Sequence, residues 1–195
     1  MKFEGGQDNP MRKLIYAINL TIDGCFDHSS FTPDEETFDF FINLVRDAGL
    51  LAYGRITYQL MVPYWPDILK NPSRETKADV DFAQAFDSAE KVVFSKSLKK
   101  VEDRNSRIVR TKPEDEIRKL KQEKGKNILL GGVALPSYLI KLGLVDEYIF
   151  VVAPVIAGKG KRLTDGVSLP EKLRLKLAES KIFKSGTVAL HYVKP

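Results

Sequence analysis

The order of apolar and polar residues predicts that the folded part of the chain starts with a buried strand. Residues 14–22 are nearly all apolar or β-favouring, and the run stops at Asp23 and Gly24, a turn signal. A continuous apolar run of this length is typical of a strand that is covered on both faces. We therefore expect a central strand here, with a turn at its carboxyl end.

The next stretch predicts an amphipathic helix that starts at Pro33. Thr32 is the expected N-cap, and Glu35, three residues later, would complete a capping box with it. Gly49 suits the position just after the helix. The apolar residues of the helix recur at i, i+3, i+4 and i+7 and predict one buried stripe, formed by Phe38, Phe41, Ile42 and Val45.

The remaining elements alternate between short apolar strands and helices. Residues 61–77 are rich in proline and polar groups and are expected to form a loop. Near the C-terminus, leucines alternate with charged residues before a turn at Gly186, which predicts an antiparallel hairpin with one wet face. Strands are expected at residues 50–53, 91–94, 107–110, 127–130 and 147–155, and helices at 78–86, 113–124 and 134–142.

Strand, helix and strand in succession predict parallel strands that are joined by crossovers. The expected fold is therefore α/β, with helices on both faces of a central mixed sheet. This sheet is mostly parallel and carries the antiparallel hairpin at its C-terminal end. The length suits one domain, expected over residues 11–195, and the polar residues 1–10 are expected to form a disordered tail.

The composition indicates the compartment of the protein and argues against a membrane span and a zinc site. No apolar run approaches the ~20 residues that cross a bilayer, and the N-terminal residues lack the apolar stretch of a secretory signal. The single cysteine, Cys25, excludes an internal disulfide, is too few for a zinc cluster, and fits a reducing compartment. We expect a cytoplasmic protein without a metal site and without a membrane partner.

The net charge of +5 at pH 7 suits a small partner that carries phosphate. Lysines gather at residues 96–100, 119–126 and 159–162, but acidic residues are interleaved through much of the chain. The basic runs lack the interleaved aromatic residues of a nucleic-acid-binding surface. A small-molecule substrate is therefore expected, and nucleic acid is not.

The expected carboxyl ends of the parallel strands carry the residues that are best suited to bind a ligand. Ligands of open α/β sheets bind beyond this edge. The Gly-Gly pair at 131–132 lies between a strand and a helix, where backbone N–H groups can reach a phosphate. A tight turn without a ligand is the alternative reading of this pair. A guanidinium fork, hydroxyls and an ammonium group add donors at other strand ends, namely Arg55, Thr57, Ser95 and Lys96.

Several short motifs follow one another between residues 14 and 192. They are T-I-D-G at 21–24, G-R-I-T-Y at 54–58, P-Y-W-P at 63–66, F-S-K-S-L at 94–98, G-G at 131–132, L-V-D-E at 144–147 and P-V-I-A-G-K-G-K-R-L at 154–163. In order and spacing they resemble the dihydrofolate reductase superfamily. The branch they resemble most shares the C-terminal reductase domain of bacterial riboflavin biosynthesis proteins.

The resemblance implies a three-layer dihydrofolate-reductase-like fold, NADPH as the hydride donor, and often a homodimer. It places Gly54, Arg55 and Thr57 at the cofactor phosphates, and Ser95 and Lys96 at the adenosine 2′-phosphate. It places Ala17 on the first strand, under the edge of the nicotinamide. The residues that would line the pyrophosphate and the nicotinamide are Gly131, Gly132, Val133, Ala134 and Leu135.

On the substrate side, Asp23 is the candidate catalytic residue, as a group that orders the substrate or a water. A simple turn residue is the alternative for Asp23, and a packed loop anchor is the alternative for Trp65. The candidate substrate-binding residues are Asp23, Phe26, Phe38, Tyr58 and Trp65.

Dihydrofolate reductases place an acid on the first helix, and three residues of this chain compete for that position. Asp34 and Glu35 are equally well explained by the helix start, and Asp39 is expected off the apolar stripe. Folate reduction is therefore not inferred.

The leading hypothesis is an NADPH-dependent oxidoreductase that acts on a CH–NH or carbonyl group of a pterin-, pyrimidine- or flavin-precursor-like heterocycle. A nucleotide-binding protein without turnover, as a sensor or scaffold, is the alternative.

Overall fold

One mixed sheet of eight strands organises the molecule, in the order β4-β3-β2-β5-β1-β6-β8-β7. The computed structural model describes residues 11–26, 33–163, 165 and 172–195. The strands are β1 Leu14–Thr21, β2 Leu50–Gly54, β3 Lys91–Phe94, β4 Ser106–Val109, β5 Ile128–Leu130, β6 Glu147–Ala153, β7 Lys176–Ile182 and β8 Val188–Val193. The helices are α1 Glu35–Asp47, α2 Arg55–Lys70, the 3₁₀ helix η2 Pro72–Arg74, α3 Lys77–Ser88, α4 Pro113–Gln122 and α5 Ala134–Lys141.

The sheet is parallel from β4 to β6 and antiparallel at its C-terminal side. β1 lies between β5 and β6 and is parallel to both. β2 likewise runs parallel to β3 and β5, and β3 to β4. β8 is antiparallel to β6 and to β7. The expected mostly parallel sheet with a C-terminal hairpin is confirmed.

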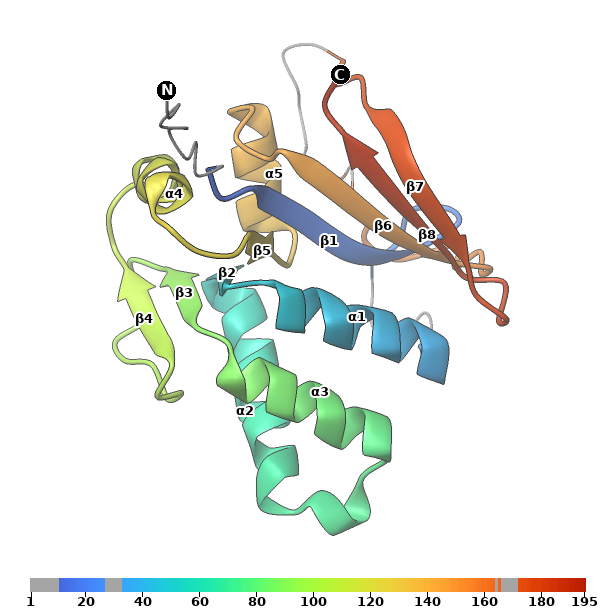
Figure 1. Ribbon diagram of the computed structural model, residues 1–195, viewed down its shortest axis with the longest axis horizontal. Helices are drawn as coiled ribbons and strands as arrows, with labels where there is room; N and C mark the ends of the chain where they lie inside the picture. Colours follow the sequence, from blue (N-terminus) through green and yellow to red (C-terminus); the bar gives the residue numbers. More distant parts are fainter. Residues whose placement is uncertain (1–10, 27–32, 164, 166–171) are drawn as a thin grey trace, which may run out of the picture.

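Helices cover both faces of the sheet (Figure 1). α1, α2 and α3 lie on one face, and α4 and α5 lie on the other. Because side chains alternate along a strand, Tyr16 and Ile18 of β1 join the core under α4 and α5, while Ala17 points toward the α1 side. This is the three-layer arrangement that the sequence predicts.

Most of residues 61–77 are helical, in α2 and η2 and at the start of α3, so the expected loop is wrong. Within α2, Tyr58, Val62 and Ile68 are buried, and Tyr58 and Val62, at i and i+4, pack against α3 and the sheet. Pro63 and Pro66 sit inside the helix and remove two backbone donors, but Pro63 is exposed. Burial of the apolar stripe therefore outweighs the cost of the prolines.

The start of α1 also differs from the expected capping box. Asp34 is the N-cap, and its carboxylate accepts a hydrogen bond from the Thr37 backbone N–H at 2.9 Å. Glu35 is the first helical residue, and Thr32 lies outside the described residues. The expected stripe is confirmed, since Ile42 and Val45 are buried against the sheet.

The hairpin is expected to have one buried and one solvent-exposed face, but its first strand does not follow this pattern. β7 begins only at Lys176, and each of its residues is exposed. It is the edge strand and pairs with β8 alone. The alternation of leucines and charged residues here therefore predicts a strand correctly, but it does not predict that one face of this strand is buried.

Candidate functional site

The carboxyl ends of β3, β2 and β5 lie side by side at one edge of the sheet. Gly54 at the end of β2 is in register with Phe94 of β3, and Ala52 is in register with Leu130 of β5. The residues that follow these strands, Ser95 and Gly131 among them, therefore meet at a common edge. This is the edge at which the sequence predicts a ligand.

The turn at Gly131 and Gly132 is tightly packed against its neighbours. A Cβ on Gly131 would lie 2.6 Å from Cε1 of Tyr53, and one on Gly132 would lie 2.1 Å from Oγ1 of Thr57. Gly132 also has φ +88°, a conformation that side chains disfavour. Both glycines are thus required by the close approach of the chain itself, whether or not a ligand also uses the turn.

Two helix N-termini adjoin at this turn. α2 starts directly after Gly54 and α5 directly after Val133, and neither N-cap residue accepts a side-chain hydrogen bond within the described ranges. A Cβ on Gly54 would lie 3.6 Å from Cβ of Leu135, and Thr57 touches Gly132, so the two helix starts are in contact. Each start leaves backbone N–H groups for an anion, and both dipoles favour negative charge there. The arrangement fits a pyrophosphate.

Tyr16 holds the glycine turn from inside the core. Its hydroxyl donates to the Gly132 carbonyl at 2.9 Å, and burial raises the pKa of the phenol, so the hydroxyl stays protonated. The sequence analysis had no signal for this contact, because Tyr16 lies in an otherwise ordinary apolar strand. Tyr16 therefore fixes the orientation of the peptide that follows Gly132.

Tyr16→Phe should lower the free energy of unfolding by about 1–2 kcal/mol, since a buried carbonyl loses its donor. Urea unfolding of the purified protein measures the difference. Tyr148→Phe is the matched control, because Tyr148 lies opposite Tyr16 in β6 and its buried hydroxyl has no partner among the described residues. A loss as large in Tyr148→Phe as in Tyr16→Phe would show that the Gly132 contact contributes nothing specific.

Four other predicted site residues lie in the first turn of α2, on β1 or after it, and directly after Gly132. Arg55 is exposed in the first turn of α2, where its guanidinium donates to Oε1 of Gln59 at 2.7 Å. Ala17 is the first residue of β1 beyond its pairing with β5, so it lies where β5 leaves the sheet for the glycine turn. Phe26 and Val133 both pack, partly buried, on the core under α4 and α5.

Ser95 and Lys96 begin a turn after β3. The Ser95 hydroxyl accepts hydrogen bonds from the backbone N–H groups of Ser97 and Leu98 at 3.2 and 2.9 Å. Lys96 is exposed. Arg110, which the sequence analysis placed only as the last residue of a strand, contacts the carbonyls of this turn.

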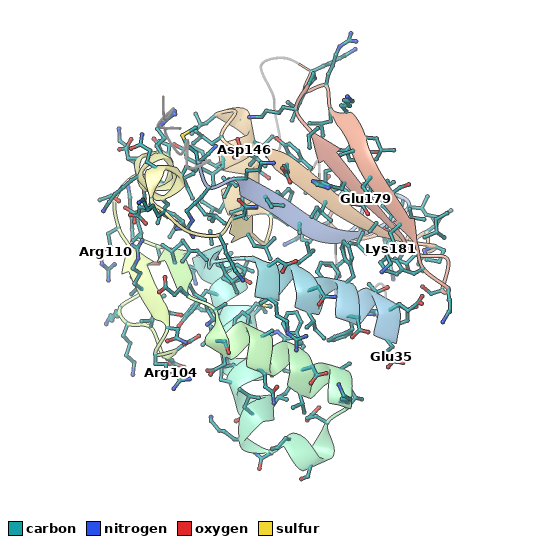
Figure 2. The ribbon with its side chains drawn as sticks, in the orientation of Figure 1. Glu35, Arg104, Arg110, Asp146, Glu179 and Lys181 are labelled. Atoms are coloured by element: carbon teal, nitrogen blue, oxygen red, sulfur yellow. The ribbon has the colours of Figure 1, made fainter. Side chains whose placement is uncertain are left out.

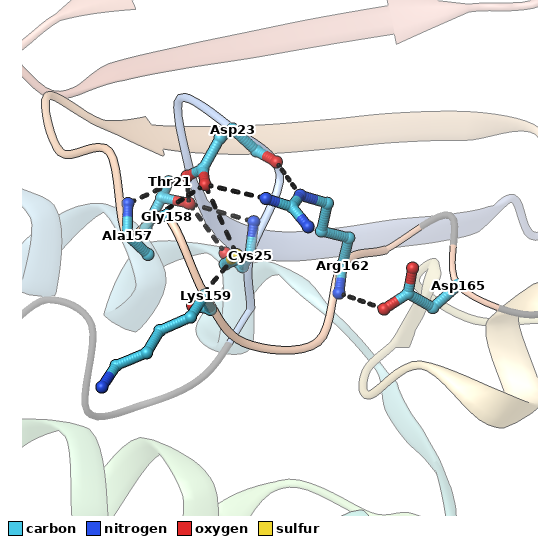
Figure 3. A network of polar contacts seen from close by, with 8 residues as sticks. All are labelled: Thr21, Asp23, Cys25, Ala157, Gly158, Lys159, Arg162 and Asp165. Carbon is cyan, nitrogen blue, oxygen red and sulfur yellow. Dashed lines mark hydrogen bonds and ion pairs between the residues drawn. The ribbon is translucent and has the colours of Figure 1, made fainter.

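Asp23 lies in a separate polar network at the far end of β1 (Figure 3). Its carboxylate accepts hydrogen bonds from the Thr21 hydroxyl at 2.6 Å and from the backbone N–H groups of Ala157 and Gly158 at 3.0 Å each. Arg162 adds an ion pair at 3.3 Å and donates to the Asp23 carbonyl. These hydrogen bonds, that of Thr21 foremost, hold the pKa of Asp23 well below its usual range. Asp23 is therefore ionised at neutral pH and joins two loops through its hydrogen bonds, which makes it a poor proton donor.

Three of the predicted substrate residues lie in the helical layer instead of at the glycine turn. Phe38 and Trp65 form an aromatic cluster with Phe82, with ring centroids 6.3 Å apart for Phe38 and Trp65 and 4.2 Å apart for Trp65 and Phe82. The buried Tyr58 hydroxyl accepts from the backbone N–H groups of Glu102 and Asp103. Their side chains pack within the protein in the described structure, and their contact with a substrate stays a prediction.

Over the described ranges, no three histidine, cysteine or acidic side chains are grouped so that they could ligate a metal ion. Within the same ranges, no helix combines the length and apolar character of a membrane span.

Residues 12–189 match the family model described as the RibD C-terminal domain. The chain belongs to the RibD C-terminal domain family. This family is part of the dihydrofolate reductase-like superfamily, so the resemblance inferred from the short motifs is confirmed.

Two relatives of similar length match nearly the whole of this chain. The protein YyaP of Bacillus subtilis (strain 168), which is named as uncharacterized, is 29% identical over 185 residues, covering 93% of this chain and 94% of YyaP. A structure from Shewanella sp. PV-4, named provisionally as a riboflavin biosynthesis protein, has TM-score 0.68 at 18% identity and covers 94% of this chain and 99% of its own.

A longer relative carries the same domain. The diaminohydroxyphosphoribosylaminopyrimidine deaminase/5-amino-6-(5-phosphoribosylamino)uracil reductase of Thermotoga maritima has TM-score 0.67 at 17% identity. The match covers 95% of this chain but only 57% of that one. At this identity the likeness establishes the fold alone.

Proposed function

We propose that this protein is an NADPH-dependent reductase that transfers a hydride to a small heterocycle of the pterin, pyrimidine or flavin-precursor class. The observation that carries the proposal is the contact between the uncapped starts of α2 and α5 at the glycine turn. Membership of the RibD C-terminal domain family supports it, since the relative from Thermotoga maritima is named as a uracil reductase.

The residues around the glycine turn suit the parts of the cofactor in a definite order. Backbone N–H groups at the starts of α2 and α5 would hold the pyrophosphate, with Arg55 as an additional charged donor. Ser95 and Lys96, one strand further along the edge, would meet the 2′-phosphate. Ala17 and Val133 would border the nicotinamide, which supplies the hydride.

Asp23 contributes to this function by ordering loops. Its ionised carboxylate ties the end of β1 to residues 157–162, near the edge where the substrate would lie. Because its pKa is depressed, it remains charged at neutral pH and holds no proton to donate. We propose that the proton accompanying the hydride comes from water.

Titration of the purified protein with NADPH and NADH, followed through the fluorescence of Trp65, its only tryptophan, tests the cofactor half of the proposal. Saturable binding that is tighter for NADPH is expected. Absence of a saturable response to either nucleotide, checked by calorimetry, would refute the proposal. Oxidation of NADPH with dihydrofolate, then with pyrimidine and flavin precursors, tests the substrate half.

Nucleotide binding without turnover is the second candidate, and the start of α1 is the observation that favours it. Asp34 is occupied as the helix cap, and Asp39 is exposed. Neither is positioned as the substrate acid of a folate reductase. NADPH binding with no oxidation by any acceptor of the panel would select this candidate.

Arg55→Ala should weaken NADPH binding by about 1.5–3 kcal/mol, the size of a lost hydrogen bond to a charged group. The free energy of unfolding should hardly change, because the Arg55 side chain is exposed and its hydrogen bond within the described residues is to the exposed Gln59. Calorimetric titration measures the affinity. Arg118→Ala, an exposed arginine on α4, is the control. If Arg55→Ala and Arg118→Ala bind NADPH with equal affinity, Arg55 does not contact the cofactor.

A further inference from the structure

Arg110 follows β4, the outermost parallel strand, and reaches across to the turn after β3. Its Nη2 donates to the Leu98 carbonyl at 2.7 Å, and its Nη1 donates to the carbonyls of Lys96 at 3.1 Å and Ser95 at 3.5 Å. A guanidinium presents several donors in one rigid plane, so it can hold several carbonyls at once. Arg110 thus fixes the carbonyl side of residues 95–98.

The amide side of the same turn is fixed by Ser95. Its Oγ accepts from the N–H groups of Ser97 and Leu98, so the lone pairs of the hydroxyl are occupied within the turn. The hydroxyl hydrogen is then the group that Ser95 can offer to an acceptor outside the turn. A phosphate oxygen is such an acceptor, and the Lys96 ammonium adjoins it in sequence.

The charge on Arg110 adds to this effect. Among the described residues no carboxylate lies within ion-pair distance of Arg110, whereas Arg104 and Arg107, before and on β4, pair with Asp87 and Glu116. Arg110 draws three carbonyl oxygens, whose partial negative charge would repel an anion, toward itself. The exposed Lys96 ammonium and the Ser95 hydroxyl hydrogen are then the groups of the turn that remain for an anion.

We propose that Arg110 is a positioning residue that holds the 95–98 turn ready for a terminal phosphate group and thereby sets the preference for NADPH over NADH. The inference rests on the proposed function, because it takes Ser95 and Lys96 as the groups that meet the 2′-phosphate. Arg110 acts through the turn and does not itself contact the nucleotide.

Arg110→Ala should lower the ratio of NADPH affinity to NADH affinity about tenfold. Most of the change should be weaker binding of NADPH, because the turn that would contact the 2′-phosphate is no longer held in place. Calorimetric titration of each nucleotide against the wild type and the variant measures the ratio. Arg110→Lys keeps the charge but has no planar fork, so it should restore only a small part of the ratio.

A readout that needs no nucleotide accompanies the titrations. Hydrogen exchange of the Ser97 and Leu98 amides in the free protein should accelerate in Arg110→Ala. Arg104→Ala is the matched control, because Arg104 lies at the other end of β4 (Figure 2) and pairs with Asp87 instead of the turn. Arg104→Ala should leave both the exchange and the affinity ratio unchanged.

The outcomes separate the two levels of the proposal. Failure of the wild type to bind either nucleotide would overturn the proposed function. If the wild type prefers NADPH, this inference is overturned by an unchanged ratio in Arg110→Ala, by an equal loss for both nucleotides, or by full rescue with lysine. Unchanged amide exchange at residues 97 and 98 would overturn it whatever the nucleotides do.

Discussion

Gly132→Ala should abolish measurable NADPH binding and lower the free energy of unfolding by about 2–5 kcal/mol. The new Cβ would lie 2.1 Å from Oγ1 and 3.2 Å from Cβ of Thr57, so the start of α5 must move away from the start of α2. Overpacking of this kind costs about 1–3 kcal/mol, and a left-handed conformation for alanine adds about 1–2 kcal/mol. Denaturant unfolding and calorimetric titration measure the two effects.

Gly143→Ala separates the clash from the backbone strain. Gly143 also has a left-handed φ, +66°, but a Cβ there would meet no atom within 4 Å. It should therefore cost only the strain and leave nucleotide binding intact. Adding Thr57→Ala to Gly132→Ala removes the nearest atom and should recover part of the stability. If Gly132→Ala proves no less stable than Gly143→Ala, the packing of the two helix starts is not what requires the glycine.

Asp103→Ala should lower the free energy of unfolding by about 3–5 kcal/mol, since it leaves a buried ammonium without its counter-ion. Nζ of Lys91 lies 2.7 Å from Oδ2 of Asp103, and the two side chains are 0% and 2% exposed. Burial lowers the pKa of Lys91 in spite of this partner. The Ala89 carbonyl, at 2.7 Å, and the ring of Phe86, 4.6 Å below the ammonium, cannot replace a carboxylate.

The exposed pair of Asp67 and Lys70 on α2 is the control for this ion pair. Its side chains are 65% and 71% exposed, so Asp67→Ala should cost less than about 1 kcal/mol. The double variant Lys91→Met/Asp103→Leu removes both charges and should recover much of the loss. An Asp103→Ala protein as stable as Asp67→Ala would contradict the assignment of a desolvated pair. Thermal and urea unfolding give the comparison.

Part of the candidate site could be predicted because parallel strands bring their carboxyl ends to one edge. Once residues 50–53, 91–94 and 127–130 are recognised as parallel strands, the groups that follow them are expected along the same edge of the sheet. Gly54, Ser95 and Gly131 are neighbours for this reason. The roles of Asp23 and Arg110 could not be predicted this way, because their contacts depend on how separate loops meet.

Asp23 and Tyr58 illustrate the limit for single residues. Turn preference explains the position of Asp23 after β1, but its carboxylate accepts a hydrogen bond from Ala157, which lies 134 positions later in the chain. Tyr58 is the last residue of the G-R-I-T-Y motif, yet its hydroxyl accepts a hydrogen bond from a loop residue 44 positions later in the chain. Local residue type sets which hydrogen bonds a side chain can make, and the fold decides which of them it makes.

By itself, the sequence determined the alternation of strands and helices, the parallel core with its antiparallel hairpin, and the glycine turn at the carboxyl end of a parallel strand. These features follow from periodicities of two and 3.6 residues and from turn residues, which act within a few positions of the chain. Only the tertiary structure decided that residues 61–70 continue α2 through two prolines, that Asp34 caps α1, and that Arg110 holds the turn after β3. Each of these depends on burial or on a hydrogen-bond partner that tertiary packing supplies. The local sequence pattern does not reveal which partners these are.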